Sequence, residues 1–172
     1  MNIQHSSRTD EWGTPPDIIA AVHEVLGCID LDPCSSEKWN QTVRAGRYFD
    51  RHVDGLSQYW YGNVFCNPPG GKAGNKSLSG LFWSKLMSER CDEVRHAIFL
   101  AYSIESLQST QKPGQPSILD FTICVPRRRL RFVSSGVEKR SPSHSSVIVY
   151  VPGVVDLTES FIQVFSKFGV CN

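Results

Sequence analysis

Hydrophobic positions recur at two spacings along the chain, and together these predict alternating helices and strands. Between Pro16 and Gly27, apolar side chains stand three and four positions apart, as on one face of a helix. Thr14, followed by two prolines, predicts the N-cap of this helix, and Gly27 predicts its end. Asp156 and Glu159 have capping-box spacing at the start of the last helical pattern. Further helices are predicted over 77–90, 104–109 and 156–168.

Short apolar runs separate the helical patterns and predict buried strands. Helices alternating with such strands are typical of an α/β fold with a largely parallel sheet, in which ligands bind beyond the carboxyl ends of the strands. Asp32-Pro33 and Asn67-Pro68-Pro69 each follow a predicted strand, so the pattern favours a shared cleft. The stretch 126–145, with Gly136 and Pro142, is typical of a hairpin or a crossing loop. Strands are predicted over 28–31, 63–66, 96–101, 119–125 and 146–151.

Composition is that of a globular protein of ordinary domain size. The chain has 172 residues, of which 40% are hydrophobic and 20% charged, so one compact domain over 1–172 is expected. A net charge of +1 provides no general attraction to nucleic acid, so an anionic partner would need a local basic patch. The N-terminus lacks a signal-peptide pattern and no run is long enough to span a membrane, which predicts a cytosolic protein.

The cysteines do not indicate a metal centre. None of the six has the two- or three-residue separation of a zinc knuckle, and no histidine pair stands at metal-ligand spacing. A thiol beside an apolar run packs as a small hydrophobic side chain. We therefore expect reduced, structural cysteines and no bound metal. The six are Cys28, Cys34, Cys66, Cys91, Cys124 and Cys171.

A set of motifs stands in a fixed order along the chain: Trp12-x-Thr14-Pro15, Asp32-Pro33-Cys34, Asp54-Gly55-Leu56, Trp60 and Asn67-Pro68-Pro69. In this order they resemble the phage DNA N-6-adenine methyltransferase family, over roughly residues 9–151. The later Arg131-Phe132 and the strand at 146–151 fit the same family. The resemblance implies a Rossmann-like methyltransferase, a three-layer sandwich with a mostly parallel sheet and an antiparallel C-terminal strand. It also implies S-adenosylmethionine as the cofactor and DNA as the partner.

The segment Asn67-Pro68-Pro69 has the chemistry that this family requires. Consecutive prolines cannot continue a central strand, because each lacks a backbone N–H, and they form a rigid corner instead. Oδ1 of Asn67 and the Pro68 carbonyl could accept the two amino hydrogens of adenine, so that the nitrogen lone pair points at the methyl donor. Such a reaction depends on positioning and needs neither a strong base nor a metal. The catalytic residues implied are Asn67, Pro68 and Pro69.

The resemblance further implies the residues that contact the cofactor. Asp32 would accept from the methionine ammonium, and Asp54 would lie near the amino group of the cofactor's adenine. An ordinary helix start at Thr14-Pro15 and an ordinary turn at Asp54-Gly55 are alternative interpretations. The expected cofactor-binding residues are Trp12, Thr14, Pro15, Asp32, Pro33 and Asp54.

The sequence departs from the family pattern at two positions. Gly70 follows the prolines where amino-methyltransferases usually carry an aromatic residue that stacks on the flipped base, a contact worth about 1–3 kcal/mol. The glycine-rich turn that usually follows the first strand is replaced by Pro-Cys-Ser-Ser after Asp32. Phe82, Trp83 or Tyr102 could supply the missing ring. Alternatively, the segment after Gly70 could be mobile until it binds DNA.

Two basic segments are candidates for DNA contacts. Lys72 and Lys76 flank the glycine-rich run after the prolines, and arginines cluster just past the strand predicted to end at residue 125. Arginine grips phosphate bidentately, although a solvated surface run is the alternative interpretation. The expected DNA-binding residues are Lys72, Lys76, Arg127, Arg128 and Arg129.

The favoured function is therefore transfer of a methyl group from S-adenosylmethionine to adenine N6 in DNA, with low sequence specificity or a very short recognition site. The protein would act in the cytoplasm, that of the host cell if a phage encodes it. Methylation of cytosine N4, methylation of RNA, and a DNA-binding relative without catalysis remain alternatives.

Overall fold

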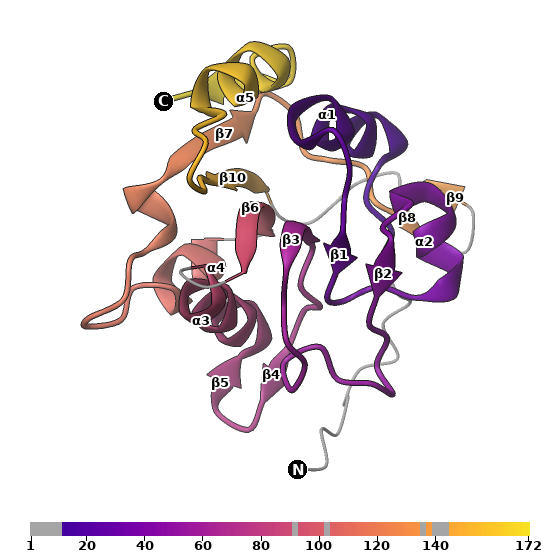
Figure 1. Ribbon diagram of the computed structural model, residues 1–172, viewed down its shortest axis with the longest axis vertical. Helices are drawn as coiled ribbons and strands as arrows, with labels where there is room; N and C mark the ends of the chain where they lie inside the picture. The colour runs from indigo at the N-terminus through magenta and orange to yellow at the C-terminus, as the bar shows by residue number, and fades with distance from the viewer. Residues whose placement is uncertain (1–11, 91–92, 102–103, 135–136, 139–144) are drawn as a thin grey trace.

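The structure, a computed structural model, describes residues 12–90, 93–101, 104–134, 137–138 and 145–172. Within these residues a seven-stranded sheet has the order β11-β7-β10-β6-β3-β1-β2 (Figure 1). The strands are β1 Leu31–Asp32, β2 Arg47–Tyr48, β3 Gly62–Cys66, β6 Val94–Ala101, β7 Thr122–Pro126, β10 Val147–Val151 and β11 Gly169–Cys171.

The sheet is mixed, and most of its strands run in one direction. Neighbouring strands are parallel from β2 through β1 and β3 to β6. β10 is antiparallel to both β6 and β7, and β11 is antiparallel to β7. The prediction of an α/β fold with a mostly parallel sheet is thus confirmed. The expected antiparallel strand in the C-terminal part of the chain is also present, and a second one was not predicted: β10 inserts between β6 and β7, and β11 then pairs with β7 as the edge strand.

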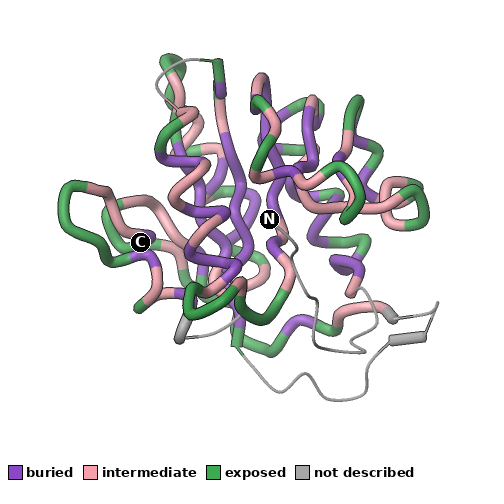
Figure 2. Tube along the Cα trace, turned by 90° about the horizontal axis from the view of Figure 1, so that it is seen from below, coloured by how far each residue is buried: buried purple, intermediate pink, exposed green. Residues whose placement is uncertain are grey.

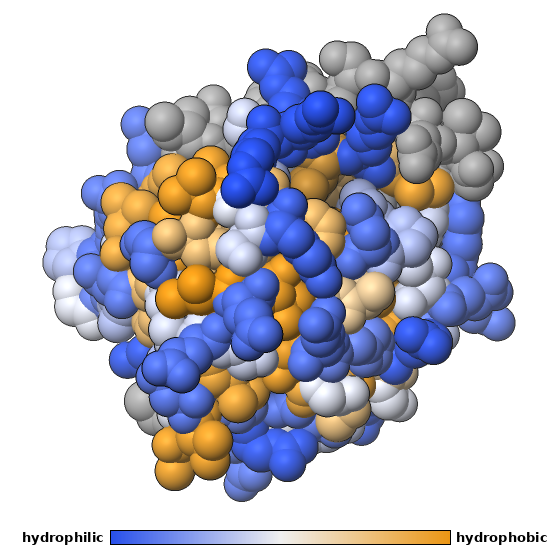
Figure 3. All heavy atoms as spheres, turned by 90° about the horizontal axis from the view of Figure 1, so that it is seen from above, coloured by the Kyte–Doolittle hydropathy of each residue, from blue (hydrophilic) through white to orange (hydrophobic). Residues whose placement is uncertain are grey.

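Helices cover both faces of the sheet. The helices α1 Pro16–Leu26 and α5 Thr158–Phe165 bury their apolar sides on one face, whereas α3 Leu78–Glu89 packs on the other. Alternate side chains of the central strands enter the two cores, so Phe65 contacts the first cluster and Val64 the second. Figure 2 shows the buried central strands. Figure 3, viewed from above, shows hydrophilic side chains on the outside of the α1 and α5 layer, with hydrophobic ones between them.

The start of α1 differs from the prediction. Pro15 occupies the N-cap position and Pro16 begins the helix, so Thr14 lies one residue further out and does not cap it. Gly27 ends the helix at a φ of 76°, as its position predicted. At α5 the expected capping box was also wrong: Leu157 holds the cap position, and the Asp156 carboxylate accepts from the Thr158 N–H at 2.9 Å.

Several short elements complete the fold, and some were not predicted. The helix α4 Ile104–Ser109 matches its prediction, whereas the run expected as a strand over 119–125 overlaps the 3-10 helix η1 Ile118–Asp120 before β7 begins. The hairpin β8 Val133–Ser134 with β9 Val137–Glu138 confirms the hairpin expected between β7 and β10. The helix α2 Glu37–Val43 escaped prediction because it buries only Val43 and so shows little hydrophobic periodicity. Among the described helices, none has the length and hydrophobicity to cross a membrane.

Candidate active site

The residues singled out at the ends of β1 and β3 lie at one edge of the sheet. Asp32 is the last residue of β1, and Asn67 directly follows Cys66 at the end of β3, its parallel neighbour. The Asn67 side chain is half-buried, and its Nδ2 donates to Oγ1 of Thr14 at 3.1 Å. Pro68 is buried and Pro69 half-buried behind it. The structure therefore brings three of the predicted segments together, although they are far apart in the sequence.

Asp32 is a buried carboxylate in an unfavourable environment. Its side chain is 3% exposed, and burial raises its pKa from 3.8 to about 7, although a hydrogen bond from the Cys34 backbone N–H at 3.2 Å opposes the shift. In the described structure it has no salt bridge to a cation. A positively charged group brought to this position would stabilise the ionised form. The site thus favours a cationic ligand beside Asp32.

The turn that contains Asp54 packs directly on the corner after β1. Asp54 adopts a left-handed φ of 55°, and its Oδ1 accepts from the Leu56 N–H at 3.2 Å. A Cβ added to Gly55 would lie 1.9 Å from the Pro33 carbonyl oxygen. The buried indole of Trp60 donates to the Gly55 carbonyl at 2.8 Å. Glycine is therefore required at position 55, and Trp60 anchors the turn; sequence reasoning did not find either role.

Replacing Gly55 with alanine is expected to force this turn away from the Pro33 corner, because the new methyl group meets backbone and not a movable side chain. We expect a loss of about 1–3 kcal/mol in the free energy of unfolding, measured by urea titration. Gly46→Ala is the matched control, since its Cβ would make only ordinary contact, 3.5 Å from the Asp30 carbonyl oxygen. Equal stability of the two variants would contradict the close packing of this turn.

A pair of thiols at this edge was not predicted as a pair. The Sγ atoms of Cys34, two residues after β1, and Cys66, the last residue of β3, are 3.6 Å apart. Burial raises the pKa of the Cys34 thiol well above its ordinary value and also raises that of Cys66, so both remain protonated at neutral pH. The sequence did contain a signal for this pair, because each cysteine stands within two residues of a predicted site residue that follows one of two neighbouring parallel strands. The described cysteines Cys28, Cys34, Cys66, Cys124 and Cys171 are all free.

The glycine- and lysine-rich run is a paired hairpin in the structure, and its ordering on DNA stays a prediction. The strands β4 Lys72–Ala73 and β5 Lys76–Ser77 pair antiparallel and lead directly into α3. Both lysines are exposed. Lys76 also lines a cavity of about 450 Å³ at the start of α3, together with Lys112. The hairpin therefore presents two cations, and a third lysine lines the same cavity.

The rings considered as substitutes for the aromatic residue missing at position 70 lie elsewhere. Phe82 is 5% exposed and Trp83 fully buried, and both belong to the core beneath α3. Trp83 donates from its indole nitrogen to the Pro116 carbonyl at 2.8 Å. Neither ring is available to stack on a base, because the amphipathic pattern of the helix places both inward. Tyr102 lies outside the described residues.

The arginines after β7 have different environments. The guanidinium of Arg127 donates to the carbonyls of Ser166 and Lys167, at 3.1 and 3.3 Å, and so stabilises the C-terminal end of α5. Arg128 and Arg129 are exposed. Because β7 runs in the same direction as β6, these arginines follow a strand end on the same side of the sheet as Asn67. Arg127 thus has a structural role that the sequence did not indicate.

The remaining N-terminal candidates lie beside the Asn67 corner. Trp12 is half-buried, Thr14 is 6% exposed, and Pro15 is buried. Gly13 between them exchanges two backbone hydrogen bonds with Val133, at 2.8 and 2.9 Å. This segment is therefore fixed against β8 before α1 begins.

Comparison with known proteins agrees with these motifs. The model of the family described as DNA N-6-adenine-methyltransferase (Dam) matches residues 2–153. The chain belongs to this family, which confirms the resemblance found in the sequence. No curated protein matches the chain significantly.

Proposed function

We propose that the chain is a single Rossmann-like methyltransferase domain that transfers a methyl group from S-adenosylmethionine to adenine N6 in DNA. The observation that carries the proposal is the placement of Asn67. Its amide stands at the carboxyl edge of the sheet with Nδ2 bound to Thr14, so Oδ1 is the end left to accept from an amine. Membership of the DNA N-6-adenine methyltransferase family supports the same reaction.

The corner after β3 would hold the target amine in a reactive geometry. Oδ1 of Asn67 and the Pro68 carbonyl accept the two N6 hydrogens, which draws the nitrogen lone pair out of conjugation with the ring. Proline fixes φ, so the carbonyl is oriented before the base arrives and no reorganisation is needed during reaction. The same two oxygens then stabilise the positive charge that develops on N6 before it loses a proton to solvent.

The groups beside this corner fit the proposed cofactor. The buried Asp32 carboxylate, with its pKa raised to about 7, matches the methionine ammonium of S-adenosylmethionine. Asp54, held against Pro33 by the close approach of Gly55, borders the same corner. When bound, the cofactor supplies a methyl group on a sulfonium sulfur, which leaves as a neutral thioether as the new N–C bond forms.

The exposed cations suit the backbone of DNA. Lys72 and Lys76 lie on the hairpin that continues from the prolines, and Lys112 lines the same cavity as Lys76. Arg128 and Arg129 lie beyond β7 on the same side of the sheet. A target base must leave the duplex to reach Asn67, at a cost of a few kcal/mol. Contacts of the hairpin lysines and of Arg128 and Arg129 with DNA phosphates would offset part of this cost.

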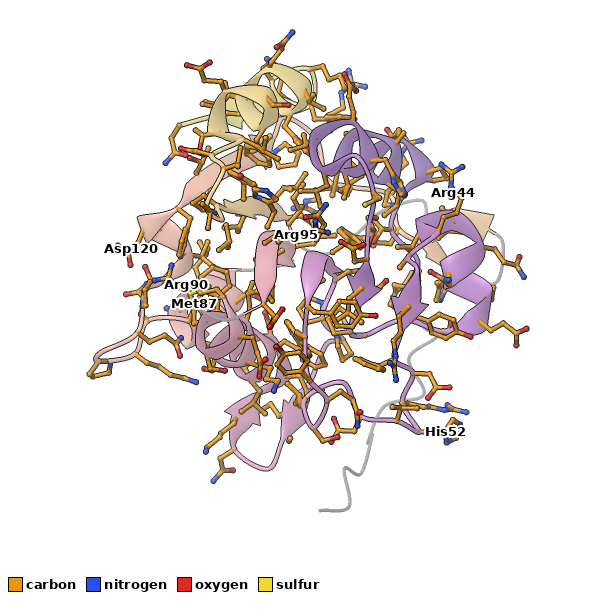
Figure 4. All side chains as sticks on the ribbon, in the orientation of Figure 1. Arg44, His52, Met87, Arg90, Arg95 and Asp120 are labelled. Atoms are coloured by element: carbon orange, nitrogen blue, oxygen red, sulfur yellow. The ribbon has the colours of Figure 1, made fainter. Side chains whose placement is uncertain are left out.

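Arg128→Ala is expected to weaken DNA binding to a similar extent for all sequences and to reduce the slope of log K against log salt by about 0.9, the effect of one phosphate contact. Fluorescence anisotropy across a salt series measures both. Arg44→Ala is the matched control, because Arg44 is an exposed arginine before the amino end of β2, at the other edge of the sheet (Figure 4). An effect confined to one recognition sequence would contradict a phosphate contact.

Nucleoside analysis of DNA and RNA incubated with the protein and S-adenosylmethionine tests the reaction. N6-methyladenine in DNA is the expected product, and sequencing of modified bases in expressing cells would show how short the recognition site is. Detection of N4-methylcytosine, or of methylation in RNA alone, would contradict the proposed substrate and identify cytosine or RNA in its place. DNA binding without cofactor binding in calorimetry would instead define a relative that has lost catalysis.

A further inference from the structure

The amide of Asn67 has two different ends, and the proposed reaction can use only one of them. Oδ1 accepts hydrogen bonds and Nδ2 only donates, so a rotation of the amide by 180° would turn a donor toward the target amine. In the structure Nδ2 is 3.1 Å from Oγ1 of Thr14 and donates to it. This bond satisfies the donor end and leaves the acceptor end for the substrate.

The Thr14 hydroxyl is available for this contact because it does not cap the helix α1. Pro15 holds the N-cap position of α1, and no side chain caps that helix. The Thr14 side chain is 6% exposed, so its hydroxyl is directed into the protein. Threonine next to a helix start usually caps the helix, but here its hydroxyl accepts a hydrogen bond from the Asn67 amide instead.

Thr14 is also held on both sides by packed structure. On one side, Gly13 pairs with Val133 through two backbone hydrogen bonds. A Cβ added to Gly13 would lie 2.2 Å from the Trp39 ring, so the backbone is pressed against that ring. On the other side, Pro15 and Pro16 lead directly into α1. The position of the hydroxyl is therefore set by the fold.

We infer that Thr14 is a positioning residue for the transfer reaction, acting through Asn67 and not through the cofactor; the inference rests on the function proposed above. The hydrogen-bond chain runs from the target amine to Oδ1 of Asn67, and from Nδ2 to Thr14. Each bond of such a chain polarises the next, so the threonine hydroxyl increases the negative charge on Oδ1. That charge matters most when N6 becomes positive in the transition state.

Thr14→Val keeps the shape of the side chain and removes the hydroxyl. We expect the rate of methyl transfer at saturating cofactor and DNA to fall about tenfold, the effect of one lost hydrogen bond. Thr14→Ser, which restores the hydroxyl, is expected to recover most of the rate. The Kd for S-adenosylmethionine, measured by calorimetry, should stay within about twofold of the wild-type value. Thr122→Val on β7, far from the corner, controls for the loss of a hydroxyl as such.

A double-mutant cycle separates positioning from a structural role. In an Asn67→Ala background, Thr14→Val should cause no further loss of rate, because the group on which it acts is gone. Full activity of Thr14→Val would overturn the inference, as would an equal loss in both backgrounds. A variant whose sole defect is weaker cofactor binding would also overturn it and make Thr14 a cofactor contact.

Nuclear magnetic resonance of the side-chain amides tests the contact without any reaction. The Asn67 signals are identified by their absence in Asn67→Ala, and they should shift in Thr14→Val but not in Thr14→Ser. Unchanged signals in Thr14→Val would overturn the role of Thr14. Failure of the wild-type protein to methylate any nucleic acid would instead overturn the proposed function, so the two failures are distinguishable.

Discussion

Asn67→Ala is expected to reduce turnover on DNA by a hundredfold or more, equivalent to about 3 kcal/mol of lost transition-state stabilisation. The substitution removes the side-chain acceptor at the carboxyl edge of the sheet and leaves the Pro68 carbonyl alone to hold the amine. The Kd for S-adenosylmethionine should change little, because the amide is assigned to the target base. Single-turnover methylation and calorimetry measure the two quantities separately.

Asn75→Ala is the matched control for this experiment, since Asn75 is an exposed asparagine in the turn of the β4–β5 hairpin. It should keep the wild-type rate. Near-normal methylation by Asn67→Ala would remove Asn67 from its proposed role. Weak cofactor binding with an unchanged rate at saturation would assign the residue to the cofactor instead.

Asp32→Asn is expected to make the cofactor-free protein more stable at pH 8. The folded-state pKa of about 7 is above the ordinary value of 3.8, so the folded protein holds a proton on Asp32 that the unfolded chain has lost between these values. Stability from this group is therefore fully present below about pH 4 and falls as the pH rises to 7, by on the order of 4 kcal/mol. Asparagine carries no charge, so this loss should disappear; urea titrations at pH 5 and pH 8 measure it.

The same substitution should weaken the binding of S-adenosylmethionine by a hundredfold or more, because a buried cation then loses its counter-charge. For the wild-type protein, affinity should rise about tenfold per pH unit up to pH 7 and then level off, as Asp32 becomes ionised without an added ligand. Calorimetry between pH 5.5 and 8.5 would follow both effects.

Glu24→Gln is the control for Asp32→Asn. Glu24 is an exposed carboxylate 3.1 Å from Lys167, and surface pairs of this kind contribute about 1 kcal/mol or less. Its removal should leave cofactor affinity unchanged. If Asp32→Asn lowered stability at pH 8 and kept the affinity, Asp32 would be a structural carboxylate with a partner that the proposal does not include.

Stability and activity are thus expected to oppose each other at Asp32. Burying a carboxylate without a cation costs stability in the free protein, and the same burial strengthens its attraction for a ligand cation. The amino end of the same strand shows the contrast: Asp30, just before β1, accepts from Arg95 (labelled in Figure 4) at 2.7 Å and so has a cationic partner. Only one of the two neighbouring acids carries the strain expected of a binding site.

Hydrophobic spacing was sufficient to predict the elements that bury a continuous apolar face. The helices α1 and α3 and the strands β3 and β10 lie close to their expected bounds, because each packs several side chains into a core. Elements with little burial, such as α2 and β11, were missed because no pattern marks them. At α1 the bounds were nearly right but the cap was wrong, since cap preferences cannot reveal that a threonine is bonded to a residue 53 positions away.

The sequence by itself determined the α/β class, the family and the order of the motifs, because these depend on spacing and residue type along the chain. It also placed Asp32 and Asn67 at strand ends, from the prolines that follow them. Tertiary structure alone decided that Thr14 contacts Asn67, that Gly55 presses on Pro33, and that Arg127 binds the end of α5. These are contacts between distant segments, and their geometry is set by how helices and strands pack, which no local pattern encodes.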